Sequence, residues 1–99
     1  MTLSQWQAEV ARFIAEYDLE ASETARMLDL VSEVGELAKE ILQGSDYGAV
    51  PVALPATWPL EMGDTLFALL CLANVTEVDL AQALAQAMAK YRARLEETG

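Results

Sequence analysis

Two short stretches of the chain place acidic side chains three positions apart. Residues 33–36 read EVGE, and residues 61–64 read EMGD. Positions i and i+3 of an α-helix lie about 60° apart around the axis, so the two acids of each stretch point to one side of a helix. Each pair can therefore place two carboxylate oxygens on one cation. If helix packing brings the pairs together, four carboxylates can form a divalent-cation site.

The remaining side chains narrow the choice of metal. The chain has no histidine and a single cysteine, Cys71, inside an apolar run. The lack of histidine excludes catalytic triads with histidine, haem ligation by histidine, the usual zinc sites and di-iron centres built on Glu-x-x-His. All-oxygen ligation favours Mg²⁺, Mn²⁺ or Ca²⁺. We expect Cys71 to be a small buried hydrophobe without a disulfide partner.

The charge balance restricts the partners. Sixteen acidic residues face six basic ones, which gives a net charge of −10 at pH 7. A field of this sign repels nucleic acid and anionic membrane surfaces and attracts divalent cations, so we expect no nucleic-acid and no membrane partner. Residues 1–20 carry scattered charges, unlike a signal peptide, and the longest apolar stretch is far shorter than the roughly 20 residues of a membrane span. The expected location is the cytoplasm.

Helical periodicity and turn signals predict an all-α fold in a single domain over residues 1–99. The expected helices cover about residues 2–17, 22–43, 59–76 and 79–97, and the Gly- and Pro-containing segment 44–57 is the only long loop. Short connections predict antiparallel neighbours and hence a four-helix antiparallel bundle. Apolar residues make up 54% of this short chain, so we expect homo-oligomerisation to complete the bundle.

The acids of the two stretches need not have the same role. On the second helix Glu33 and Glu36 lie beside an apolar stripe, and a solvated acidic face is the simpler interpretation. Residues 65–75 read TLFALLCLANV, and a helix that is apolar all round is buried. Glu61 and Asp64, at the head of that helix, are therefore not ordinary surface acids. The positive end of the helix dipole offers a structural role to Glu61, worth about 0.3–1 kcal/mol, and a weaker one to Asp64.

The motifs, in their order and spacing, resemble the signature of the MazG-type all-α nucleoside triphosphate pyrophosphohydrolases. Glu33-x-x-Glu36 is followed, after residues 37–60, by Glu61-x-x-Asp64. The surrounding sequence agrees: EVGELAKEI at 33–41, EMGDTLFALLCLAN at 61–74 and VDLAQALAQAMAKYRARL at 78–95. The resemblance covers roughly residues 22–96.

The resemblance implies both a chemistry and an assembly. It implies an all-helical homodimer or dimer-of-dimers tetramer that cleaves a (d)NTP between the α and β phosphates into (d)NMP and pyrophosphate, for house-cleaning of the nucleotide pool. It implies Mg²⁺ as the cofactor, with Mn²⁺ as a possible substitute. Glu33, Glu36, Glu61 and Asp64 would be the metal ligands, and Glu33 or Glu36 would take the proton of the attacking water.

The substrate contacts are less clearly indicated. Lys39, Lys90 and Arg94 are the candidates for the phosphates, although long basic side chains are often simply solvated. In the family a lysine often occupies the position that is Ala87 here, and Lys90 is the substitute we consider. Trp6 is a candidate for stacking on the base, with a core role as the alternative. Asn74 could contact the sugar or base, or cap the end of its helix.

Two other functions fit the same residues. The first is a helical oligomerisation module without catalysis, and the second is a protein that binds divalent metal at this site without turnover. Release of pyrophosphate from a nucleotide distinguishes the enzyme from both.

Overall fold

The computed structural model describes residues 1–98 as four helices, with no strand in that range. They are α1 (Leu3–Glu16), α2 (Glu23–Gly44), α3 (Trp58–Val75) and α4 (Leu80–Thr98). The all-α prediction is confirmed, and the predicted helix bounds lie close to the observed ones.

Local capping explains where the helices begin. Thr2 and Gln5 form a reciprocal capping box: the Thr2 hydroxyl accepts the Gln5 backbone N–H at 3.1 Å, and the Gln5 side-chain oxygen accepts the Thr2 N–H at 2.7 Å. The Ser22 hydroxyl accepts the Ala25 N–H at 3.2 Å at the start of α2. Before α4, Asp79 Oδ1 accepts the Ala81 N–H at 3.0 Å. These caps lie at the predicted starts of their helices, residues 2, 22 and 79.

The end of α2 differs from the prediction in one respect. Gly44 is the last residue of the helix and not a residue beyond it, and the cap is Ser45. A Cβ at position 44 would lie 2.3 Å from the Ala53 carbonyl oxygen, and the Ala53 N–H donates to the Gly44 carbonyl at 2.9 Å. Glycine is needed here because the loop returns close to the helix, not because of a left-handed backbone.

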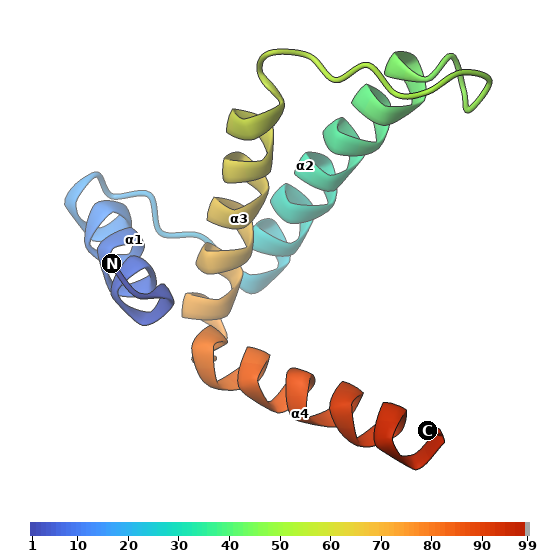
Figure 1. Ribbon diagram of the computed structural model, residues 1–99. Helices are drawn as coiled ribbons and strands as arrows, with labels where there is room; N and C mark the ends of the chain where they lie inside the picture. Colours follow the sequence, from blue (N-terminus) through green and yellow to red (C-terminus); the bar gives the residue numbers. More distant parts are fainter. Residues whose placement is uncertain (99) are drawn as a thin grey trace.

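Two of the four helices form an antiparallel pair, and the other two lie outside it (Figure 1). α2 and α3 run side by side in opposite directions, α1 packs against α3, and α4 leaves the far end of α3 as a separate arm. The prediction of antiparallel neighbours is therefore right for α2 and α3 and wrong for α3 and α4, whose axes differ by 103°. The Gln7 side chain of α1 explains the turn, since it binds the Val78 carbonyl at 2.8 Å and the Leu80 N–H at 2.8 Å.

The single chain has a small core. Val10, Leu70 and Cys71 form a buried cluster that Leu3, Ile14 and Leu80 extend. The expectation that α3 is buried all round does not hold within one chain: Leu60 is 68% exposed, and Met62 and Leu66 are nearly half exposed. One side of α3 meets α2 and another meets α1, which leaves a third apolar side open.

The apolar character of α3 is also insufficient for a membrane span. Among residues 1–98, no single helix has the length and composition needed to cross a bilayer. α3 and α4 meet those criteria only when they are taken together, as a sharply bent pair.

Candidate metal and nucleotide site

Glu61, in the first turn of α3, has the most unusual carboxyl group among the residues described. Its side chain is half-buried, and its Oε2 atom is buried with no hydrogen-bond partner. Burial raises the pKa of Glu61 above its ordinary value, and the negative charges of Glu40, Glu36, Asp64 and Glu33 raise it further, in that order. A buried oxygen without a donor is costly unless something else binds it.

The antiparallel pairing of α2 and α3 explains why these charges meet. Glu33, Glu36 and Glu40 follow the i, i+3, i+7 spacing of one helix face, and Glu61 and Asp64 follow the i, i+3 spacing on the neighbouring helix. In Figure 1 the two helices diverge toward this end, and the charges of the α2 acids still act on Glu61. The structure thus gathers the EVGE and EMGD acids in one region. Within residues 1–98, however, no three acids converge closely enough to hold one metal ion.

Glu40 is the acid that the sequence analysis did not select. It is half-buried, and its negative charge raises the pKa of Glu61 more than the charge of any other acid does. The signal was present in the sequence, because Glu40 lies four residues after Glu36 and therefore on the same side of the helix. It was overlooked because it lies outside the two four-residue motifs.

The acidic cluster of Glu33, Glu36, Glu40, Glu61 and Asp64 is also suited to a cation, because no basic side chain among residues 1–98 forms an ion pair with it. The ion pairs within residues 1–98 join Arg12 to Glu9 and Arg26 to Asp29, and neither involves the cluster. Lys39, one turn from Glu36, is exposed. Carboxylates without His or Cys, one of them with a buried free oxygen, match the ligand preference of a hard divalent cation.

The predicted substrate-binding residues are more widely spread. Lys90 and Arg94 flank the exposed Tyr91 ring on α4, at 4.6 Å and 6.0 Å from its centroid. Because α4 starts at the end of α3 opposite Glu61 and leads away from it (Figure 1), these bases lie on a different part of the chain from Glu33, Glu36, Glu61 and Asp64. Trp6 is half exposed on α1.

Asn74, the remaining predicted contact, is part of an internal hydrogen-bond network. Its Oδ1 accepts from Gln7 Nε2 at 3.1 Å, and its Nδ2 donates to the Gln7 backbone carbonyl at 3.0 Å. Gln7 itself is buried. The side chain of Asn74 thus joins α3 to α1, and it does not cap the end of its own helix.

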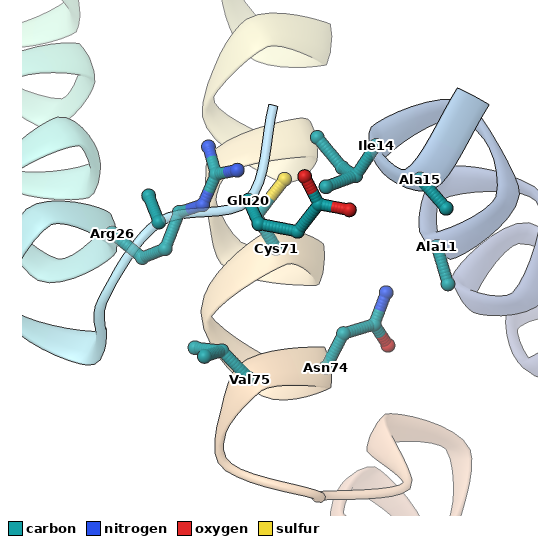
Figure 2. A pocket seen from close by; sticks show the side chains of 9 residues that line it. Ala11, Ile14, Ala15, Glu20, Arg26, Cys71, Asn74 and Val75 are labelled. Atoms are coloured by element: carbon teal, nitrogen blue, oxygen red, sulfur yellow. The ribbon is translucent and has the colours of Figure 1, made fainter. Parts of the chain in front are cut away.

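Asn74 also lines a cavity of ≈ 240 Å³ between α1, the α1–α2 connection, α2 and α3 (Figure 2). The walls are mainly apolar and include three further polar side chains. The lining residues are Ala11, Ile14, Ala15, Glu20, Ala21, Arg26, Cys71, Asn74 and Val75. The Cys71 thiol is buried, and burial raises its pKa above its ordinary value.

Comparison with known proteins identifies the family. A sequence model of the MazG nucleotide pyrophosphohydrolase domain matches residues 21–98. The chain belongs to the MazG family. As a member of that family, the protein is a nucleotide pyrophosphohydrolase. The non-catalytic alternatives are therefore not favoured.

Three known proteins resemble the chain over most of its length. YpjD of Bacillus subtilis is 36% identical over 97 residues, which cover 94% of this chain and 86% of that protein. The crystal structure of YpjD has a TM-score of 0.76 at 37% identity and covers 92% of this chain and 93% of that one. A Bacillus-conserved MazG nucleotide pyrophosphohydrolase has a TM-score of 0.76 at 33% identity, with 92% and 89% coverage. The MazG-like pyrophosphohydrolase of cyanophage S-2L, bound to dGDP and three catalytic Mn²⁺ ions, has a TM-score of 0.68 at 28% identity, with 94% and 83% coverage.

Proposed function

We propose that the protein is a Mg²⁺-dependent nucleoside triphosphate pyrophosphohydrolase that converts a (d)NTP to the monophosphate and pyrophosphate. The observation that carries the proposal is the buried, unpartnered Oε2 of Glu61, surrounded by the charges of Glu33, Glu36, Glu40 and Asp64. Such a group is disfavoured in the empty protein and favoured once a cation is bound. The Mn²⁺ ions of the cyanophage relative support divalent metal in this fold.

Glu33, Glu36, Glu61 and Asp64 are the proposed ligands, and Glu40 adds charge beside them. When bound, Mg²⁺ would screen the phosphates from these acids, polarise the α-phosphorus and lower the pKa of the attacking water. Glu33 or Glu36 accepts the proton of that water, because both belong to the cluster and neither forms an ion pair within residues 1–98. Mn²⁺ should substitute, since it prefers the same oxygen ligands.

We further propose that the working form is a homodimer or a dimer of dimers. Large hydrophobic side chains are exposed on the open side of α3 and along α4, where Leu84 and Met88 are examples. A second copy of the chain can cover them. In a second copy, Lys90 and Arg94 of α4 could reach the acidic cluster of the first, and Trp6 could join the same site. Light scattering coupled to size-exclusion chromatography tests the assembly.

The chemistry is tested by incubating a panel of (d)NTPs with Mg²⁺ and analysing every product. We expect pyrophosphate and the nucleoside monophosphate in equal amounts, and none without the metal. Direct release of orthophosphate and a diphosphate would contradict cleavage between the α and β phosphates. No turnover of any triphosphate would point to another nucleotide substrate for this member of the family.

A further inference from the structure

The cavity of Figure 2 lies in line with the acidic cluster along α2 and α3. Arg26 precedes Glu33 by seven residues on α2, and Cys71 follows Asp64 by seven residues on α3. Seven residues advance a helix by about 10 Å and bring it back to within about 20° of the same direction. Because the helices are antiparallel, both steps lead from the acids toward the cavity. A nucleotide with its phosphates at the acids can therefore direct its base to this cavity, with the sugar between them.

The cavity has the character of a site for a flat aromatic group. Ala11, Ile14, Ala15 and Val75 supply apolar walls, and a few polar side chains share the same space. Pockets with apolar walls and a few placed polar groups are typical of small-molecule sites. Ala11 and Ala15 of α1 are small side chains and leave part of the cavity open.

Two of the polar side chains are fixed by the protein itself. The Arg26 side chain is only 12% exposed, and its guanidinium donates to the Leu19 carbonyl and pairs with Asp29 at 3.8 Å. Asn74 is held by Gln7. Arg26 has five N–H donors in a rigid planar group, so donors remain for a ligand.

Glu20 is an exposed residue of the α1–α2 connection that lines the same cavity as Arg26, and its carboxylate forms no hydrogen bond or ion pair within residues 1–98. In the view of Figure 2 the two side chains lie on either side of the Cys71 sulfur. The cavity thus offers a fixed donor group and an unpartnered acceptor group at separate positions.

We propose that this cavity binds the base of the nucleotide and that Glu20 and Arg26 select guanine. The inference rests on the proposed function. Guanine offers two neighbouring acceptors, O6 and N7, which match the paired donors of arginine. It also offers the N2 amino group and the adjacent N1–H as two neighbouring donors, which match a carboxylate. Adenine places its N6 amino donor where Arg26 needs an acceptor, and pyrimidines lack the neighbouring O6 and N7 acceptors of guanine.

The experiment compares kcat/KM for dGTP, dITP and dATP in the wild type and in Glu20→Gln. Hypoxanthine, the base of dITP, lacks only the N2 amino group of guanine. We expect the wild type to prefer dGTP over dITP by roughly 10- to 100-fold, the range of one bidentate contact, and Glu20→Gln to reduce this preference to within about threefold. Glu16→Gln is the matched control, because Glu16 is an exposed acid near the end of α1 that does not line the cavity. An equal effect of Glu20→Gln on dGTP and dITP, or no preference in the wild type, would overturn the proposal.

A binding measurement separates this proposal from the proposed function. Deoxyguanosine is titrated into the full chain in EDTA while the methyl NMR signals of Ala11, Ile14 and Val75 are followed. We expect these signals to shift with deoxyguanosine, and to shift less with deoxyadenosine or in Glu20→Gln. Shifts without turnover of any triphosphate would leave the base subsite standing and reject the proposed reaction. Turnover without guanine-dependent shifts would reject the subsite alone.

Discussion

Along the α2–α3 pair, the polar groups at the cavity of Figure 2 (the cavity end) and those at Glu33, Glu36, Glu61 and Asp64 (the acidic end) are held in opposite ways. At the cavity end, Arg26 and Asn74 are fixed by hydrogen bonds to Leu19 and Gln7. At the acidic end, Glu61 has a buried oxygen without a partner, and the nearby charges are all of the same sign. At the cavity end the protein itself holds two of the polar side chains, whereas at the acidic end the proposed cation would balance the charges. Substitutions at the two ends should accordingly differ in how they respond to metal.

The largest expected effect is on turnover at the acidic end. Glu61→Gln and Glu36→Gln each remove one charged oxygen ligand, and we expect kcat/KM to fall by at least about 100-fold, since even residues that only support a metal ligand cost about 10- to 100-fold. Pyrophosphate release measures the loss, and circular dichroism checks that the helices remain. Glu16→Gln on α1 should have no effect. Unfolding of both cluster variants would show that the acids are structural.

The second prediction concerns stability with and without metal. Saturating Mg²⁺ should stabilise the wild type by about 2.7 kcal/mol at one hundred times its Kd, because only the folded chain forms the site. Thermal unfolding with Mg²⁺ or with EDTA measures this difference. Glu61→Gln should lose most of it. An equal response of the wild type and the variant would mean that Mg²⁺ binds elsewhere.

The pH dependence in EDTA gives a related test, the third prediction. The folded-state pKa of Glu61 is raised, so its favourable contribution is full below the unfolded-state pKa of about 4.3 and is lost as the pH rises through the folded value. As the pH rises from the unfolded-state pKa through the folded-state pKa, the wild type should therefore lose stability relative to Glu61→Gln. Chemical unfolding at a series of pH values checks the sign. A relative gain for the wild type would indicate a favourable partner for the carboxylate.

The fourth prediction concerns the cavity end, where Gln7 holds three elements together. Gln7→Ala removes partners from Asn74, the Val78 carbonyl and the Leu80 N–H, so we expect a loss of about 2 kcal/mol in the free energy of unfolding. The Mg²⁺-induced gain in stability should be unchanged. Gln5→Ala, in the exposed capping box, is the control and should cost about 1 kcal/mol. A larger Mg²⁺-induced gain in stability for Gln7→Ala than for the wild type would show that the cavity end and the acidic end influence each other.

The sequence predicted the elements better than their arrangement. Helix periodicity and caps such as Thr2 and Ser22 are local, so four helices and their starts could be read directly. The position of α4 depends on a hydrogen bond between Gln7 and Leu80, residues that are far apart in the sequence, and no local pattern reveals it. The EVGE and EMGD motifs indicated the acidic end of the α2–α3 pair. Glu40 and the cavity were missed because helix packing, rather than motif spacing, brings their residues together.

The smallest effect, and the fifth prediction, concerns the glycines inside the two acidic motifs. A Cβ at Gly35 or Gly63 meets no atom within 4 Å outside its immediate surroundings, whereas one at Gly44 meets the Ala53 carbonyl oxygen. Because glycine is unfavourable inside a helix, Gly35→Ala should raise the free energy of unfolding by about 0.5–1 kcal/mol, while Gly44→Ala should lower it. Urea unfolding of both variants measures the contrast. Destabilisation by Gly35→Ala would show that another chain packs closely on this part of α2, and the acidic end would then also depend on that chain.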